Sequence, residues 1–98
     1  MFSYLEKFKK LPKELQAIVS SPQATGIINE LEEKYGIELA SLAIKIMVKE
    51  ISWKGLENVL VSEHNLTQEQ AVQLKQELEQ KIFYQVTKYL GIQSKVKS

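Results

Sequence analysis

The apolar side chains of this chain recur at every third or fourth position, which is the period of an α-helix that buries one face. Ser3 and Glu6 have the spacing of a capping box, so a short first helix is expected to begin there. Its apolar face carries Tyr4, Leu5 and Phe8. Pro12 suits the first turn of a second helix, which ends at Ser20. The narrow apolar stripe of this second helix consists of Leu15, Ile18 and Val19.

Local start and stop signals also bound the middle of the chain. Ser21 as an N-cap and Pro22 at the first helical position predict a third helix. This helix ends at Gly36, because glycine readily adopts the left-handed conformation. It packs through Ile27, Ile28, Leu31 and Tyr35. Residues 38–51 are the most apolar segment, and we expect them to form a central helix covered by the others. The only continuous polar stripe of that segment consists of Ser41, Lys45, Lys49 and Ser52.

Two helices are predicted for the second half of the chain. Ser52 is placed to cap the first of them, which ends at His64 and Asn65. Its apolar side carries Trp53, Leu56, Val59 and Leu60. Thr67 and Gln70 form a second capping box, flanked by Leu66 and Ala71 as a hydrophobic staple.

The last predicted helix is long. Apolar positions recur at helical spacing from Ala71 to Tyr89, so the pattern predicts about 23 helical residues spanning roughly 34 Å before Gly91 ends them. We expect residues 92–98 to be a frayed tail. No segment alternates apolar and polar residues as a half-buried strand does. The sequence therefore predicts one all-α domain over residues 1–98, a compact bundle of about five or six helices with a long C-terminal helix.

Composition narrows the classes of function. The chain has no cysteine, no arginine and no aspartate, and its 13 lysines and 12 glutamates leave a net charge of +1. Thiolate metal sites and disulfides are thereby excluded, and sequence-specific reading of nucleic acid is disfavoured without arginine. No apolar run approaches the ~18 residues that span a bilayer, and the N-terminus shows no apolar signal core followed by a small-residue cleavage site, so we expect a cytoplasmic protein.

Several short stretches resemble a small helical domain that recurs in uncharacterised bacterial proteins. The matching residues are Leu11-Pro12-Lys13-Glu14-Leu15-Gln16, Ser20-Ser21-Pro22, Lys34-Tyr35-Gly36-Ile37, Asn65-Leu66-Thr67-Gln68-Glu69-Gln70-Ala71 and Lys81-Ile82-Phe83. They are mainly helix caps, glycines and core positions, spread over most of residues 11–90. The resemblance implies a compact helical module and attaches no activity to it.

Few residues are candidates for chemistry, and we expect no enzyme, cofactor or metal site. His64 is the only histidine and is expected to be a solvated residue at a helix end, because zinc sites and catalytic triads need further ligands or an aspartate. Glu50 lies on the apolar side of its helix and is either a buried carboxylate or one that reaches water or a lysine. Glu30, Glu32 and Glu33 point in different directions and are expected to be a solvated face.

The lysines at both ends of the chain support a second hypothesis. They are Lys7, Lys9, Lys10 and Lys13 near the start, and Lys81, Lys88, Lys95 and Lys97 near the end. If the termini lie close together, these side chains form one basic surface for nonspecific binding of nucleic acid. Residues 1–11 combine aromatic residues with lysines, but two helical turns bury too little apolar area for firm attachment to a membrane.

Apolar residues on otherwise polar faces support the first hypothesis. Tyr84, Val48 and Val61 each fall away from the predicted core stripe of their helix, and Tyr84 falls among Gln73, Gln76, Gln80 and Lys88. Aromatic anchors in polar surroundings are typical of interfaces. The preferred reading is therefore a non-enzymatic module that binds a protein partner or a second copy of itself through Tyr84, Val48 and Val61, with nucleic-acid binding as the alternative.

Overall fold

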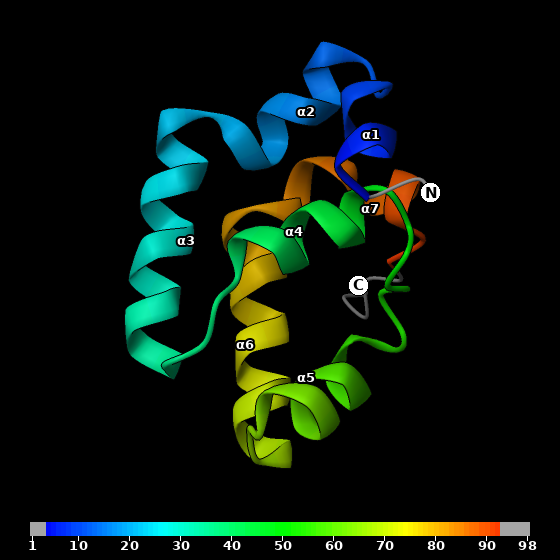
Figure 1. The fold of residues 1–98 in the computed structure, drawn as a ribbon. Helices are drawn as coiled ribbons and strands as arrows, with labels where there is room; N and C mark the ends of the chain where they lie inside the picture. Colours follow the sequence, from blue (N-terminus) through cyan, green and yellow to red (C-terminus); the bar gives the residue numbers. More distant parts are fainter. Residues whose placement is uncertain (1–3, 93–98) are drawn as a thin grey trace, which may run out of the picture.

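A computed structural model describes residues 4–92, and the regular secondary structure of this part of the chain is helical, with no strand. The all-α prediction is confirmed. Figure 1 shows the elements in order. They are α1 (Tyr4–Lys9), α2 (Lys13–Ser20), α3 (Pro22–Tyr35), α4 (Ala40–Met47), α5 (Leu56–His64), α6 (Gln68–Lys81), the 3-10 helix η1 (Phe83–Val86) and α7 (Thr87–Leu90). The predicted cap at Ser3, Lys95, Lys97 and most of the predicted tail lie outside the described residues.

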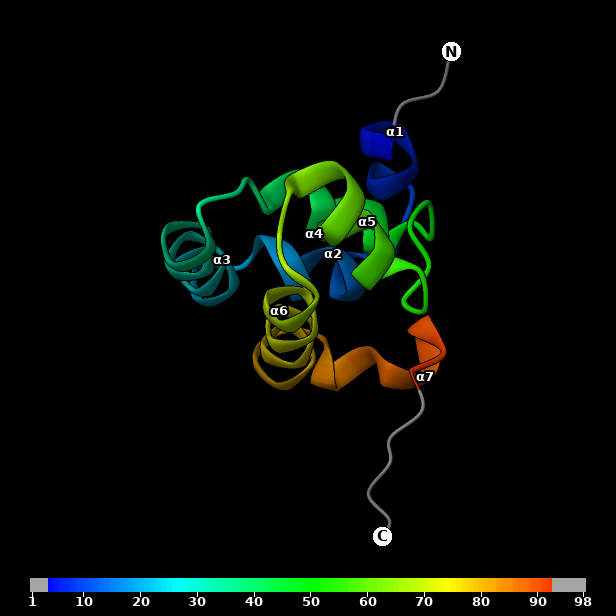
Figure 2. The ribbon, with the colours of Figure 1, turned by 90° about the horizontal axis from the view of Figure 1, so that it is seen from below.

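Two antiparallel helices form the frame of the molecule. α3 and α6 run in opposite directions in Figure 1, and Figure 2 shows both end-on and side by side. α4 packs against α1 and α2, these two helices cover one end of the molecule, and α5 packs on the first half of α6. The largest fully buried side chains come from five different elements and from the segments that join them. They are Leu31, Leu39, Ile46, Met47, Leu56, Leu60, Leu74, Leu78, Ile82 and Phe83.

The boundaries of α3 are those that the sequence predicts. Ser21 Oγ accepts a 3.2 Å hydrogen bond from the Ala24 amide, and Pro22 is the first helical residue. Gly36 adopts φ 71° and its amide donates to the Glu32 carbonyl. Only Ser21 separates α2 from α3, so residues 13–35 are the longest nearly uninterrupted helical stretch among the described residues.

The junction between α5 and α6 also follows its local signals. Asn65 ends α5 in the left-handed conformation with φ 61°. The Thr67 hydroxyl accepts a hydrogen bond from the Gln70 amide, and the Gln70 side chain accepts one from the Thr67 amide, so the capping box is complete. Leu66 and Ala71 are both buried, as a hydrophobic staple requires.

The prediction of a long C-terminal helix is wrong. α6 ends at Lys81, Ile82 leaves helical geometry with φ −124°, and the chain continues as η1 and α7 in another direction (Figure 2). The turn brings Phe83 into the core, where none of its surface is exposed. Ile92, expected in the frayed tail, is also buried, and its amide donates to the Thr87 carbonyl. Burial of these apolar side chains explains why the chain turns back instead of continuing straight.

The central helix is shorter than residues 38–51. α4 covers only Ala40–Met47, and Lys49 has a positive φ of 66°. The Tyr89 hydroxyl donates a 2.9 Å hydrogen bond to the Met47 carbonyl, and Lys49 Nζ lies 4.5 Å from the centre of the Tyr89 ring. The Tyr89 side chain from α7 thus donates to the Met47 carbonyl, which in a continuing helix would accept a backbone hydrogen bond.

α5 begins three residues later than expected. Ser52 caps a turn and not the helix itself, because its hydroxyl accepts a 3.0 Å hydrogen bond from the Gly55 amide and α5 starts at Leu56. Trp53 lies within this turn, is 9% exposed and meets Phe83 edge to face at 5.6 Å between ring centres. The turn therefore orients the large side chain that closes the core at this end.

α1 is held mainly at its surface. None of its residues is fully buried, and Leu5, expected on the apolar face, is 46% exposed. Lys7 Nζ lies 3.0 Å from Glu50 Oε2, and Lys45 Nζ lies 5.0 Å from the centre of the Tyr4 ring. Phe8 packs against the core from a half-buried position. Tyr4 and Phe8 are both half-buried, so α1 buries only one edge of its predicted apolar face.

Candidate functional site

An open groove of about 690 Å³ lies on the surface of the described part of the chain. One wall comes from α2 and the first half of α3, and the other from the end of α6 and η1. We call it the Tyr84 groove. Its lining residues are Glu14, Ala17, Ile18, Ser21, Gln23, Ala24, Ile27, Lys81, Ile82, Tyr84 and Gln85.

Tyr84 reaches this groove because of the turn after α6. Ile82 and Phe83 are buried, and the next residue, Tyr84, is 58% exposed. Tyr84 and Leu5 are the large apolar residues with substantial exposure among residues 4–92. Leaving a large aromatic ring exposed to water is unfavourable in free energy. An exposed ring beside a groove is therefore typical of a binding surface.

We call the apolar part of the lining the floor of the groove and the polar part its edges. Ile82 and Ala24 are buried, while Ile18 and Ile27 are half-buried and show part of their surface in the groove. The edges carry uncharged polar side chains and two opposite charges, one on each wall. These residues are Ser21, Gln23 and Gln85, with Glu14 on the α2 wall and Lys81 on the wall formed by residues 81–85. An apolar centre with a polar rim is the usual anatomy of a protein interface.

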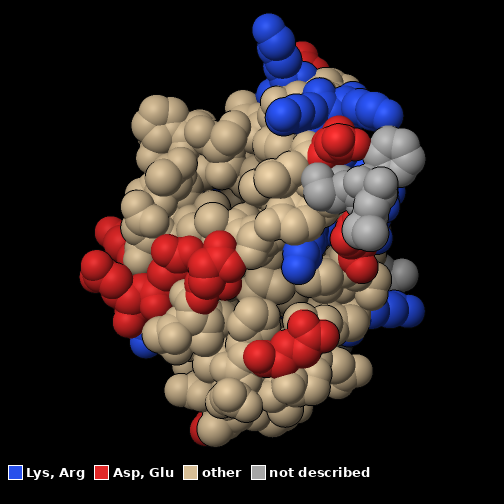
Figure 3. Space-filling model, viewed as in Figure 1, with Lys and Arg blue, Asp and Glu red and all other residues tan. Residues whose placement is uncertain are grey.

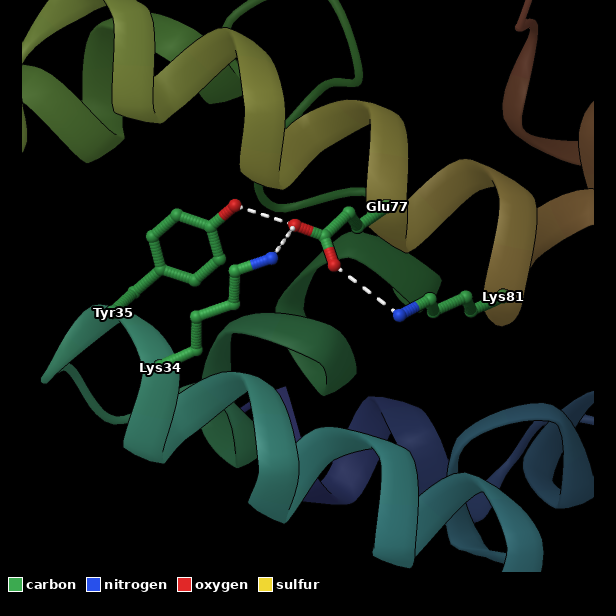
Figure 4. A network of polar contacts seen from close by, with 4 residues as sticks. All are labelled: Lys34, Tyr35, Glu77 and Lys81. Carbon is green, nitrogen blue, oxygen red and sulfur yellow. Dashed lines mark hydrogen bonds and ion pairs between the residues drawn. The ribbon is translucent and has the colours of Figure 1, made fainter.

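A polar network fixes the spacing of α3 and α6 near one edge of the groove (Figure 4). Tyr35 Oη and Lys34 Nζ donate hydrogen bonds of 2.6 Å and 2.9 Å to Glu77 Oε2. Lys81 Nζ donates a 3.2 Å hydrogen bond to Glu77 Oε1, so Glu77 holds one wall residue of the groove.

The charge state of this network is fixed at neutral pH. Burial alone would raise the pKa of Glu77, but hydrogen bonds from Tyr35, Lys34 and Lys81 outweigh it and lower that pKa to about 2. Burial and the hydrogen bond to this carboxylate raise the pKa of Tyr35 well above its usual range. Glu77 is thus charged and fully engaged, which suits a structural role and not proton transfer.

The structure does not bring the three predicted partner-binding residues together. Tyr84 lines the groove, whereas Val48 and Val61 do not. Val48 is half-buried at the end of α4, and Val61 is half-buried in α5 and packs against the core. Of the three residues, only Tyr84 has the exposure that an anchor needs.

The lysines do not form one basic surface in the described part of the chain. Lys9, Lys10 and Lys13 are exposed around α1 and the start of α2, where positive side chains gather at the top of Figure 3. Lys88 is exposed on α7, and Figure 2 shows α1 and α7 on opposite sides of the molecule. Lys7 and Lys81 are paired with Glu50 and Glu77. Converging termini are therefore not observed for residues 4–92, because residues 48–55 lie between α1 and α7.

The glutamates serve structural roles that sequence alone did not separate. Glu50 is exposed and pairs with Lys7, so it is not a buried carboxylate. Glu30 and Glu33 are exposed, as expected of a solvated face. Glu32 differs, because its carboxylate accepts hydrogen bonds of 2.7 Å and 3.1 Å from the Leu39 and Ala40 amides. It thereby caps α4 from the neighbouring helix, a contact across a loop that no local pattern reveals.

Glu38 adds a second acidic cap to α4. It accepts hydrogen bonds from the Ser41 hydroxyl and amide, and these two bonds are the main cause that lowers the pKa of its carboxyl. His64 is half-buried at the end of α5, and its charge acts more weakly on Glu38 in the same direction. No group of three or more His or Glu side chains in residues 4–92 is arranged to hold a metal ion.

A second, smaller hollow lies elsewhere on the described part of the chain. Its volume is about 100 Å³, and it lies between α1, α2, α3 and α4. The lining residues are Phe8, Val19, Ser20, Thr25, Ile28, Asn29, Ala40 and Ile44. It is smaller than the Tyr84 groove and has no exposed aromatic anchor or charged side chain in its lining.

Comparisons of the chain with family models, with curated proteins and with solved structures find no match. The resemblance of residues 11–90 to a small helical domain thus stays a prediction. None of the helices in the part of the chain that the structure describes has the length and apolar character needed to cross a bilayer.

Proposed function

We propose that this chain is a non-enzymatic helical module that binds a protein through the Tyr84 groove. The observation that carries the proposal is the 58% exposure of Tyr84 at the edge of a groove whose floor is apolar. Covering the ring and the floor together removes apolar surface from water, which is the main favourable contribution to association. Tyr84 is the anchor of this binding surface. Ile18 and Ile27 form the adjoining apolar surface that the partner covers.

The walls of the groove are rigid enough to present a fixed shape. The two ends of α3 are capped at Ser21 and Gly36, and the Glu77 network connects α3 to α6. Preorganised surfaces bind more tightly because little conformational freedom is lost on association. Docking on such a preformed surface does not call for a change of fold.

The absence of cysteine from the sequence allows a direct test. Gln85→Cys places one thiol in the groove, where a benzophenone maleimide can be attached and activated by light. In an extract of the source cells, discrete crosslinked products are expected from this probe. A matched probe at Glu33→Cys, which lies on an exposed face outside the groove, is expected to give none of them.

Tyr84→Ala added to the Gln85→Cys probe makes the test specific. Loss of an aromatic anchor costs roughly 1–2 kcal/mol or more, so the yield of each specific product should fall about tenfold. Equal products from Gln85→Cys and Glu33→Cys, or products that Tyr84→Ala leaves unchanged, would show that the groove is not the binding surface.

Nonspecific binding of nucleic acid is the second candidate function. The observation that favours it is the group of exposed lysines around α1 and the start of α2, Lys9, Lys10 and Lys13. It is the weaker candidate, because Lys7 is paired with Glu50 and Lys88 lies on the other side of the molecule. Few phosphates could be contacted at once, so little counterion release would drive binding.

A further inference from the structure

We infer that the occupant of the Tyr84 groove is a second copy of this chain, related to the first by a two-fold axis that runs along the groove. The inference rests on the proposed function and names its partner. It follows from how the two charged residues of the groove are distributed over its walls.

The two walls carry opposite charges. Glu14 is exposed on the α2 wall, and Lys81, whose side chain is 47% exposed, lies on the wall formed by residues 81–85. A two-fold axis along the groove places the α2 wall of one copy against the 81–85 wall of the other. Each Glu14 then faces the Lys81 of the other copy, and the attraction occurs twice in one interface.

Lys81 keeps exposed surface although it is paired. Its hydrogen bond to Glu77 Oε1 is 3.2 Å, and Glu77 also accepts from Tyr35 and Lys34. The carboxylate of Glu77 therefore does not depend on Lys81 alone. A glutamate from a second copy can share the ammonium group, because lysine has three donor hydrogens.

The apolar part of the groove is complementary to Tyr84. The groove is concave and its floor shows parts of Ile18 and Ile27, while the exposed ring of Tyr84 supplies a convex apolar group at its edge. In the two-fold arrangement, the ring of each copy covers the floor of the other. The surface is thus self-complementary in shape as well as in charge, as a closed dimer requires.

The overall charge does not oppose this pairing. With 13 lysines and 12 glutamates the net charge is +1, so two identical chains repel each other only weakly. The uncharged polar residues Ser21, Gln23 and Gln85 at the rim can form hydrogen bonds across the interface without a cost for burying charge.

Sedimentation velocity of the purified chain between about 10 µM and 1 mM tests the inference. The wild-type chain is expected to form a dimer in this range. Glu14→Lys and Lys81→Glu should each weaken dimerisation about tenfold or more, because each places like charges in contact twice. An equimolar mixture of these two variants should recover wild-type dimerisation, since every facing pair is again of opposite charge.

Further variants protect this test from effects on folding. Lys81→Glu adds a charge beside Glu77, so Lys81→Gln serves as the milder change and should weaken the dimer without unfolding the chain. Tyr84→Ala should weaken it about tenfold or more, because its anchor is lost. Glu30→Lys, an exposed position outside the groove, is the matched charge reversal and should leave dimerisation unchanged.

A chain that stays monomeric to about 1 mM overturns the inference. A dimer that withstands Tyr84→Ala, or one whose charge variants are not restored by mixing, overturns it as well, since such a dimer uses another face. If the chain is monomeric and the Gln85→Cys probe still crosslinks a different protein in a manner that depends on Tyr84, the proposed function stands and only self-association is wrong. If the probe also finds nothing, both fail.

Discussion

Tyr35 donates a 2.6 Å hydrogen bond to Glu77, and this contact joins the last turn of α3 to the middle of α6 across 42 positions of sequence. Glu77 also accepts from Lys34 and Lys81, so one carboxylate connects both helices with a wall residue of the Tyr84 groove. The network lies partly below the surface, since the Glu77 side chain is 14% exposed. The contribution of this network to the free energy of unfolding is therefore measurable.

Tyr35→Phe should lower the free energy of unfolding by about 1–2 kcal/mol, because it removes a hydrogen bond to a charged group. In this variant the Glu77 carboxylate keeps its two lysine partners. The loss of stability should therefore be smaller than that caused by leaving a buried charge without any partner. Urea denaturation followed by circular dichroism measures the change. Tyr84→Phe is the matched control, because its hydroxyl is on an exposed ring, and it should stay within about 0.5 kcal/mol of wild type.

The pH dependence of stability should carry the signature of Glu77. Its pKa is about 2 in the folded chain against an ordinary value of 4.5, so its contribution is complete above about pH 5 and is lost as the pH falls toward 2. Glu77→Gln removes this contribution at neutral pH, on the order of 3 kcal/mol. The stability difference between wild type and Glu77→Gln should therefore shrink as the pH is lowered. A difference that stays constant from pH 7 to pH 2 would contradict the assigned role.

Two glycines of α3 should respond to alanine in opposite directions. Gly26 lies inside the helix, and an added Cβ meets no atom within 4 Å, so Gly26→Ala should stabilise the chain by about 0.5–1 kcal/mol. Gly36 has φ 71°, where a Cβ is strained, so Gly36→Ala should destabilise it by about 1 kcal/mol. Thermal melting of the two variants side by side measures both effects. Changes of the same sign would mean that one of the two backbone conformations is wrong.

Phe83 and Tyr84 are adjacent, but their substitution by alanine should have very different effects on the free energy of unfolding. Phe83 has no exposed surface and packs on Trp53, so Phe83→Ala should cost about 3–5 kcal/mol. Tyr84→Ala should change the free energy of unfolding by no more than about 0.5 kcal/mol. Urea denaturation followed by Trp53 fluorescence compares them, and Phe83→Leu provides a milder core change if Phe83→Ala does not fold. Equal losses would place Tyr84 in the core and end its candidacy as an anchor.

Binding to random-sequence DNA should be weak and lost at physiological salt, because lysine contacts to phosphate act through counterion release. Fluorescence anisotropy of a labelled duplex over a range of salt concentrations measures this. Lys9→Gln and Lys10→Gln together should reduce whatever binding exists at low salt, and Lys54→Gln, an exposed lysine elsewhere, is the control. Tight or sequence-selective binding would reverse the order of the two candidate functions.

Most helix ends were predictable because their signals are short in range. Ser21 and Pro22 begin α3, Gly36 ends it, and Thr67 with Gln70 begins α6, each through contacts within four residues. Such contacts depend on the neighbouring residues and not on the rest of the fold. The apolar period then identifies the buried faces, so Leu31, Leu74 and their neighbours were correctly placed in the core.

The errors fall where distant contacts outweigh the local pattern. The break at Ile82 follows from burial of Phe83 against Trp53, and the early end of α4 follows from the hydrogen bond that Tyr89 donates to Met47. The width of the apolar face at Phe83 was the available signal for the break, because a straight helix would leave part of that face without a partner.

The sequence by itself thus determined the helical class and most boundaries, since caps and periodicity act through neighbouring residues. Only the tertiary structure decided which helices meet. It placed Tyr84 beside Ile18 and Ile27, which are far from it in sequence, and left Val48 and Val61 outside the groove. A groove exists only between packed elements, and its walls are set by long-range burial and by contacts such as that of Tyr35 with Glu77, which no single stretch of sequence contains.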